Sequence, residues 1–333
     1  MRVSQAHIAG IGVTGGSKHT RTRIDKLAIS AATKALLDAG VTYGCVDLTV
    51  ASFLDETRIP PKCLDAFGKH GAPVCQVDNT LGLFTAAQAV KSKQSECVLL
   101  LSIDTDEQRS ELSIVGMILV SDLFLTSHAY LKDGAVTVSG YSSTSSIYSQ
   151  SLGGPDFPRT IRTAVNAALR QARIEQRDIQ VLEIRNSSDS NTKQALEQFE
   201  VAPRISEGVK HTFTGTTGSY GLCGLVWQLR GWANDPPSKA LNCLQITLSL
   251  DGSANAIVLC RADGRSALTW EEIRNVRDGR ERLGYNPAVQ TNEITREDLI
   301  NVSTKRHFVP LDNHGDTLEL SVKGGDRAAL ARL

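Results

Sequence analysis

The chain has 333 residues, of which 41% are hydrophobic and 22% are charged, as in a globular protein of one large or two medium-sized domains. Its 36 Lys and Arg residues balance 36 Asp and Glu residues, so the net charge is zero. Because no basic surplus is available to neutralise phosphates, the composition argues against a nucleic-acid partner. The most apolar run, residues 114–125, contains Ser121 and Asp122 and is too short to span a bilayer, so we expect no membrane partner.

The first residues carry one Arg but no apolar stretch long enough for a secretion signal, which favours a cytoplasmic location. The last three residues, Ala-Arg-Leu, are loosely similar to the Ser-Lys-Leu signal, so a peroxisomal location stays an alternative. The seven cysteines form no CxxC pair and the seven histidines are scattered. This pattern indicates reduced, mostly buried thiols, and neither a disulfide frame nor a metal site.

The chain contains a weak internal repeat, formed by residues 28–53 and 161–185. Both copies begin with small and apolar residues at helical spacing: Ala31, Ala35, Leu36 and Ala39 in the first, and Ala164, Ala168, Leu169 and Ala172 in the second. Each copy then reaches an aspartate, Asp47 or Asp178, which opens a strand-like run. One repeat at this long offset predicts a duplicated domain and not a solenoid.

The later parts of the two copies also correspond. Residues 82–90 predict an alanine-rich helix before a buried strand at 97–103, and residues 218–229 predict a helix before strands at 243–250 and 254–261. Alternating helices and apolar strands favour an α/β fold whose sheets are covered on both faces. The small residues of the two helices would let them lie close together between two sheets.

The tail differs from the duplicated core. Thr269 and Glu272 form a capping-box pattern at the start of a charged helix, and residues 317–322 resemble a short strand. We therefore expect an appended segment, which would serve as a lid, an oligomerisation arm or a small added domain. The predicted organisation is a first half at residues 1–153, a second half at 154–262 and an extension at 263–333.

Several stretches resemble the thiolase superfamily, and within it the sterol-carrier-protein-x type of thiolase. They are HIAGIGVT (7–14), DKLAISAATKALLDAGV (25–41), APVCQVDN (72–79), GLVWQLRG (224–231) and QITLSLDGSANAIVLCR (245–261). The resemblance covers roughly residues 6–262. It implies the duplicated thiolase-like fold, with two mixed sheets and helices between and outside them in α-β-α-β-α layers. It also implies a homodimer that pairs through a sheet edge.

The first motif of the family places a nucleophilic cysteine at the N-terminus of a buried helix, where the helix end lowers the thiol pKa. In this chain the matching stretch is VDNTLGLFTAA, and Leu81 occupies the position of the cysteine. Cys75 lies six residues earlier, on the incoming strand. We interpret Cys75 as a core thiol, so the resemblance predicts a site without its nucleophile.

The second motif is a His-Asp loop that helps to form the oxyanion hole. Here Arg185 stands in the place of the histidine, and arginine cannot act as a base, although it can bind a carboxylate or an enolate. A salt-bridged arginine at a strand end is the alternative interpretation. The third motif carries the activating histidine, which Thr212 replaces. His211 is adjacent and is a candidate pocket residue, although a shift by one position on a strand reverses its face.

The fourth motif is a glycine-rich loop between the last strands, where Thr247 and Ser249 replace the functional residues and Asp251-Gly252 predicts a hairpin turn. Together the four departures argue against thiolysis and Claisen condensation. Only residues 104–153 connect the two halves, which leaves little room for the loop domain with which these thiolases hold coenzyme A. We therefore expect no cofactor.

The first functional hypothesis is a repurposed enzyme that forms, breaks or cyclises carbon–carbon bonds through a stabilised enolate, with a polyketide-like substrate in secondary metabolism. Sterol-carrier-protein-x-like aldolases without the nucleophile are the family precedent. The candidate catalytic residues are Asp78 or His211 as base, Arg185 as anion holder and Tyr220 as proton donor. The candidate binding residues are Asn79, Leu81, Asp189 and Thr212.

The second hypothesis is a non-catalytic partner subunit, which would complete an interface or a tunnel of an active thiolase or ketosynthase. The neutral surface charge and the charged tail are compatible with this role. Fold analogy alone does not decide between the two hypotheses.

Overall fold

The computed structural model describes residues 4–17, 24–53, 57–68, 71–106, 111–132, 134–149, 154–185, 210–213, 219–230, 240–249, 252–264 and 294–304. The chain divides into two compact units. The first comprises Met1–Thr105, Ser110–Ala135 and Glu271–Leu333, and the second comprises Asp106–Arg109 and Val136–Trp270. The three-part division at residues 153 and 262 stays a prediction.

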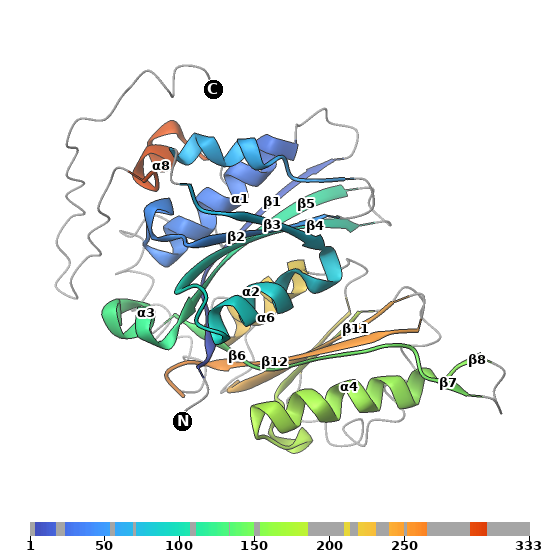
Figure 1. The fold of residues 1–333 in the computed structure, drawn as a ribbon. Coiled ribbons are helices and arrows are strands. Elements are labelled where there is room, and N and C mark those ends of the chain that lie inside the picture. The colour runs from blue at the N-terminus through green and yellow to red at the C-terminus, as the bar shows by residue number, and fades with distance from the viewer. Residues whose placement is uncertain are drawn as a thin grey trace. The chain divides into compact units, whose positions relative to one another are not determined.

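The first unit is built on a mixed sheet with a helix on each face (Figure 1). Its strands lie in the order β3-β2-β4-β5-β1, with β2 parallel to β3 and β4, and β1 antiparallel to β5. The strands are β1 (Ala6–Ser17), β2 (Leu48–Phe53), β3 (Val74–Asp78), β4 (Cys97–Asp106) and β5 (Glu111–Ser121). The helical segments are α1 (Ile24–Ala39), η1 (Tyr43–Cys45), η2 (Pro61–Phe67), η3 (Asn79–Leu81), α2 (Gly82–Lys91), α3 (Asp122–Ser127), η4 (Ala129–Leu131) and α8 (Arg296–Asn301).

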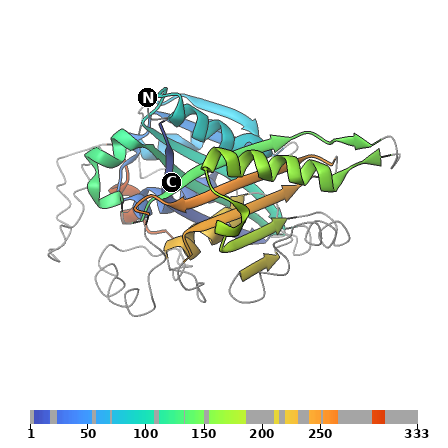
Figure 2. The same cartoon turned by 90° about the horizontal axis from the view of Figure 1, so that it is seen from below.

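The second unit has the same plan, with α4 and α6 on opposite faces of its sheet (Figure 1). Its strands lie in the order β10-β9-β11-β12-β6. They are β6 (Val136–Thr144), β9 (Val181–Arg185), β10 (Lys210–Phe213), β11 (Asn242–Leu248) and β12 (Ala254–Arg261), and the helical segments are α4 (Phe157–Ala172), η5 (Gln176–Asp178) and α6 (Ser219–Arg230). The short strands β7 (Tyr148–Ser149) and β8 (Gly154–Pro155) form a hairpin between β6 and α4 (Figure 2).

The two sheets repeat one topology. Numbered in chain order, the five described strands that form the main sheet of each unit lie in the spatial order third, second, fourth, fifth, first. In both units the second strand is parallel to the third and the fourth, while the fifth is antiparallel to the first. The mixed α/β fold and the internal duplication expected from the sequence are therefore confirmed.

A close glycine–alanine contact recurs at equivalent places in the two units. A Cβ atom on Gly10 of β1 would lie 2.2 Å from the carbonyl oxygen of Ala35 in α1, and one on Gly140 of β6 would lie 2.0 Å from that of Ala168 in α4. The next alanine along each helix, Ala39 or Ala172, is also within contact distance. The small residues that mark the sequence repeat are thus the residues that let each helix touch its sheet.

The helices of the repeat align as expected, Ala35 with Ala168 and Ala39 with Ala172, but the register of the strands differs from the expected one by two residues. The Asp47 carboxylate accepts hydrogen bonds from the N–H groups of Glu96 and Cys97, just before and at the start of β4. In the second unit the side-chain oxygen of Gln180 accepts from the N–H groups that precede and begin β11. Gln180 is therefore the counterpart of Asp47, whereas Asp178 caps η5. Asp47 and Asp178 were matched in the sequence because both are aspartates at the start of a strand-like run.

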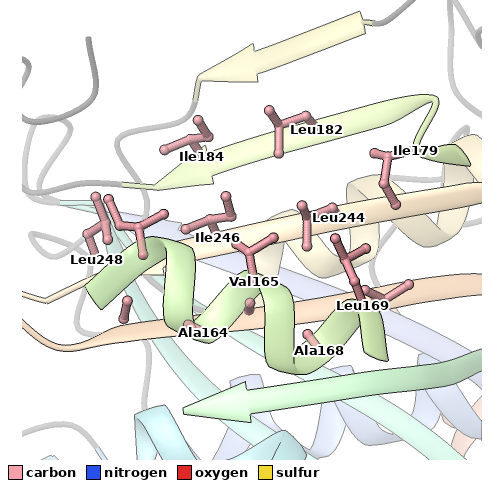
Figure 3. Packing of buried hydrophobic residues seen from close by; sticks show 14 residues of the cluster. Ala164, Val165, Ala168, Leu169, Ile179, Leu182, Ile184, Leu244, Ile246 and Leu248 are labelled. Carbon is pink, nitrogen blue, oxygen red and sulfur yellow. The ribbon is translucent and has the colours of Figure 1, made fainter. Parts of the chain in front are cut away.

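The core between α4 and the second sheet is aliphatic (Figure 3). Alternate strand residues face the helix, as expected for the period of two in a strand. The labelled members of this cluster are Ala164, Val165, Ala168 and Leu169 of α4, Ile179, Leu182 and Ile184 in and before β9, and Leu244, Ile246 and Leu248 of β11. The residues between them on β9 and β11 therefore lie on the opposite face of the sheet.

Residues 294–304 pack on the elements η1 and η2 of the first unit. The N–H group of Tyr43 in η1 donates to the carbonyl of Val302 at 2.8 Å, and the N–H group of Thr304 donates to the carbonyl of Phe67 at 3.0 Å. Val302 is fully buried. The helix expected from Thr269 and the strand expected at 317–322 lie outside the described residues.

A buried histidine joins β1 to the start of α3. His7 is buried, and its Nε2 lies 2.9 Å from Oδ1 of Asp122. Burial lowers the pKa of His7 from its usual value of 6.5, against the opposing effect of Asp122. Because protons then bind the unfolded chain more readily than the folded one, stability is complete above pH 6.5 and falls as the pH drops below it.

We therefore expect the His7→Gln variant to lose less stability than the wild type between pH 7 and pH 5. Denaturant unfolding at a series of pH values checks this expectation. Parallel stability curves for the two proteins would show that His7 does not titrate with folding.

Candidate functional site

The position of the family nucleophile lies where β3 passes into α2. β3 ends at Asp78, Asn79 to Leu81 form the single turn η3, and α2 begins at Gly82 with Leu81 as its N-cap residue. The Leu81 side chain makes no capping hydrogen bond. The first N–H groups of a helix lack partners within the helix and carry its positive partial charge, so this end of α2 favours an anionic group.

Asn79 is held in place by two buried hydroxyl groups. Its Oδ1 atom accepts a hydrogen bond from Ser52 Oγ at 2.8 Å and another from Ser102 Oγ at 2.5 Å. Ser52 lies near the end of β2, and Ser102 lies within β4, and both side chains are buried. Because both bonds involve Oδ1, the amide nitrogen of Asn79 points away from them and is a donor for another group.

Close packing explains the glycine at the start of α2. A Cβ atom on Gly82 would lie 3.2 Å from Leu100 Cδ1 and 3.3 Å from Ser52 Cβ. A larger residue would push the start of α2 away from β2 and β4. Gly82 therefore keeps the helix terminus close to the serines that hold Asn79.

No cysteine stands at this helix terminus. Leu81 is there instead, and its side chain is 43% exposed. Cys75 lies within β3, paired in register with Val50 of β2. All seven cysteines are free thiols, and burial raises the pKa of Cys63 to about 12 and that of Cys97 and Cys243 well above the usual value. These buried thiols stay protonated and cannot serve as thiolate nucleophiles.

Strand pairing in the second unit makes several candidate residues neighbours in the sheet. Arg185 of β9 pairs with Thr247 of β11, so the residues of the second and fourth motifs are neighbours. Thr212 of β10 pairs with Glu183 of β9. His211 pairs with Leu182, a member of the cluster against α4, so the two residues of the third motif occupy alternate positions of β10.

The corrected register relates these residues to the first unit. The N–H group of Asp47 donates to the carbonyl of Cys97, and that of Gln180 donates to the carbonyl of Asn242. Counting forward from these pairs makes Arg185 the counterpart of Ser52, and Thr247 the counterpart of Ser102. The candidates of the second unit therefore occupy the positions that hold Asn79 in the first unit.

The remaining candidates are Asp78, Tyr220, Asp189 and the turn residue Gly252. Asp78 is the exposed last residue of β3. Tyr220 is the second residue of α6, and its side chain is 38% exposed. Asp189 lies outside the described residues. Gly252 has a φ of +84° between β11 and β12, in keeping with the hairpin turn expected there.

Among the residues that the structure describes, no group of three or more His, Cys, Asp or Glu side chains could hold a metal ion. Across the same residues, no helix is both long and apolar enough to cross a membrane.

Ser52 and Ser102 are not among the residues predicted from the sequence. Each is a small hydroxyl residue near the end of an apolar strand, LTVASF or CVLLLSI. A polar residue at the end of a buried strand is the signal that could have indicated them. Their shared contact with Asn79 depends on strand order, which the sequence pattern did not supply.

Comparisons with known proteins show which solved structures share the fold of this chain. No family model matches the chain, and no curated protein matches it. Among solved structures, the acetyl-CoA acetyltransferase from Syntrophomonas wolfei matches with a TM-score of 0.60 at 13% identity, over 78% of this chain and 100% of that one. The Ltp2-ChsH2(DUF35) aldolase matches with a TM-score of 0.59 at 14% identity, over 78% and 98% of the two chains.

The human mitochondrial 3-ketoacyl-CoA thiolase, solved in complex with CoA, matches with a TM-score of 0.57 at 10% identity, over 78% of this chain and 98% of that one. At these identities the similarity establishes the fold and leaves the activity open. Together with the duplicated strand order and the helix that begins after Leu81, it shows that this chain has the thiolase-like fold.

Proposed function

We propose that this chain is an enzyme that makes or breaks a carbon–carbon bond by an aldol-type step, and that it is not a thiolase. The observation that carries the proposal is the anchored Asn79 at the start of α2, with Leu81 in the place of the nucleophile. Two buried serines fix an amide whose nitrogen is a donor, beside a helix end that favours negative charge. This arrangement suits an enolate oxygen and needs no covalent intermediate.

In the cleavage direction, the substrate is a β-hydroxy carbonyl compound. A base removes the proton of the β-hydroxyl group, the bond between the α and β carbons breaks, and an aldehyde or ketone leaves. The electron pair moves onto the carbonyl oxygen as an enolate, which is then protonated at the α carbon. The protein must hold the oxygen, accept one proton and return one.

The candidate residues take these roles in the proposal. Asp78 or His211 is the base, Arg185 is the anion holder and Tyr220 returns the proton. Leu81, Thr212 and Asp189 contact the remainder of a substrate that is polyketide-like. Cyclisation by the same chemistry and a place in secondary metabolism belong to this proposal.

Substitution of Asn79 tests the proposal most directly. With a panel of β-hydroxy ketones and thioesters, we expect the purified chain to release an aldehyde or ketone, measured by mass spectrometry. The Asn79→Ala variant should lower kcat by about 100-fold, since removal of one oxyanion donor typically has an effect of this size. Arg185→Ala should also lower kcat, as should alanine at whichever of Asp78 and His211 is the base.

The matched control is Arg177→Ala, which removes an arginine whose side chain is 70% exposed in the second unit. This variant should keep wild-type kcat and KM. If the wild type releases no product from any substrate of the panel, or if Asn79→Ala is as active as the control, the proposed activity is wrong.

A non-catalytic partner subunit is the second candidate function. It is favoured by exposed large apolar side chains, of which Leu123 of α3 and Tyr148 of β7 are the most exposed in the described part of the chain. The name of one matching structure, the Ltp2-ChsH2(DUF35) aldolase, joins two components. This function requires that the chain co-purifies with an active thiolase or ketosynthase, and that Asn79 and Arg185 are dispensable in that complex.

We further propose a homodimer that pairs through β3. This strand is at the edge of the first unit's sheet, and its residues Val74 to Val77 are half-buried. An edge strand with unpaired main-chain groups is a template for a second copy. Light scattering after size-exclusion chromatography distinguishes this dimer from a monomer and from a complex with another protein.

A further inference from the structure

A buried carboxylate lies in the middle of the second sheet. Glu183 of β9 is 2% exposed and Gln245 of β11 is 1% exposed. Gln245 Nε2 donates a hydrogen bond to Glu183 Oε2 at 2.9 Å, and the two residues are partners in the parallel ladder. Moving a single carboxylate out of water costs several kcal/mol. The presence of Glu183 inside a sheet therefore calls for a reason.

Glu183 and Gln245 lie on the face that α6 covers. Their neighbours Leu182, Ile184 and Leu244 belong to the aliphatic cluster against α4 (Figure 3). Alternate residues of a strand point to opposite faces, so Glu183 and Gln245 point away from α4. α6 contacts both β9 and β11 on that side.

The first unit shows that the fold does not need this polar pair. By the register that relates Gln180 to Asp47, the counterparts of Glu183 and Gln245 are Val50 and Leu100, which are partners in the β2–β4 ladder. Both are fully buried and apolar. Replacing buried ionic groups with apolar residues of similar size is often neutral or stabilising, so stability alone does not account for the pair.

The pair lies next to the candidate residues of the second unit. Thr212 is the ladder partner of Glu183 on β10. Arg185 follows Glu183 by two residues, and Thr247 follows Gln245 by two, so their Cα positions are about 6.5 Å further along the same strands. Arg185 and Thr247 are themselves ladder partners.

We propose that Glu183 is a positioning residue that acts through Arg185. Its carboxylate, fixed by the Gln245 amide, is the negative charge that complements Arg185, two residues further along β9. The inference rests on the proposed function, in which Arg185 holds the enolate oxygen. It assigns a role to a residue pair that distinguishes the second sheet from the first.

The charge of Glu183 can be removed without changing its shape. Glu183→Gln should lower kcat/KM by about 10- to 100-fold, the range expected when a group that contacts substrate is displaced by about 1 Å. Glu183→Asp, which keeps the charge, should recover part of this loss. In an Arg185→Lys background, Glu183→Gln should change kcat/KM less than it does in the wild type, because the two residues act as a unit.

The double variant Glu183→Val with Gln245→Leu installs the residues of the first unit at equivalent positions. It should stay folded, because the first unit carries these residues at the equivalent positions, and it should still lose activity. The matched control is Glu175→Gln, which removes the charge of a carboxylate with 67% side-chain exposure in the same unit. The proposal is overturned if Glu183→Gln is as active as Glu175→Gln, or if the double variant keeps full activity.

A binding measurement separates this inference from the proposed activity. If the wild type turns over no substrate, the positioning role of Glu183 is tested by calorimetry with acetoacetate, a small β-keto carboxylate. Weaker acetoacetate binding in Glu183→Gln and in Arg185→Ala, with unchanged binding in Glu175→Gln, supports the positioning role even then. Equal binding in all variants, or no binding to the wild type, overturns it.

Discussion

Replacing Gly140 with alanine is expected to destabilise the second unit by about 3 kcal/mol, the upper end of the range for overpacking a well-packed core. The added Cβ atom would lie 2.0 Å from the carbonyl oxygen and 2.9 Å from the carbonyl carbon of Ala168. Both are main-chain atoms, so no side chain can rotate to make room. Relief requires α4 to move off β6, which opens the aliphatic cluster that α4 makes with β9 and β11.

The duplication makes the same prediction for the first unit. Gly10→Ala would place its Cβ atom 2.2 Å from the carbonyl oxygen of Ala35 and 2.7 Å from Ala39 Cβ. Denaturant unfolding measures both losses, and hydrogen exchange shows which unit opens. We expect faster exchange in α4 for Gly140→Ala and in α1 for Gly10→Ala.

Two glycines of the second unit provide matched controls. A Cβ atom on Gly154 or on Gly224 would meet nothing within 4 Å. Gly224→Ala, within α6, should stabilise the chain by up to about 1 kcal/mol through helix propensity, and Gly154→Ala should have little effect. A loss for Gly140→Ala no greater than for Gly154→Ala would show that α4 does not approach β6 this closely.

The sequence predicted the elements well where local pattern decides them. The strand expected at residues 254–261 is β12 to the residue, and the helix expected at 82–90 is α2 with one residue more. Apolar runs bounded by glycine and polar residues define such elements locally. The helix of the first repeat likewise has its alanines on the buried side.

Long-range relations were harder to predict. The contact of Ser52 and Ser102 with Asn79 joins three segments that are far apart in the sequence, and each serine alone is unremarkable in a buried strand. The strands of the repeat were aligned on Asp47 and Asp178, although the side-chain oxygen of Gln180 performs the role of Asp47. An amide oxygen and a carboxylate accept the same hydrogen bonds, so identity of residue type is a poor guide to equivalence.

Deleting residues 294–333 is expected to destabilise the first unit by about 2 kcal/mol. The deletion removes the buried side chains of Val302 and Leu299 and breaks two main-chain hydrogen bonds of about 1 kcal/mol each. At the scale expected for a domain of this size, the net loss lowers the Tm by several degrees.

The contacts of the segment define both the control and the decisive measurement. Residues 294–304 contact η1 through Tyr43 and η2 through Phe67, and a Cβ atom on Gly68 would lie 2.6 Å from Thr304 Oγ1. Deleting only residues 305–333 keeps all of these contacts, so this shorter deletion is the reference against which the Tm of the longer one is compared. Because η2 connects β2 to β3, loss of the segment should also speed hydrogen exchange in β3, beside Asn79. Equal exchange and equal Tm for the two deletions would show that residues 294–304 contribute nothing to the first unit.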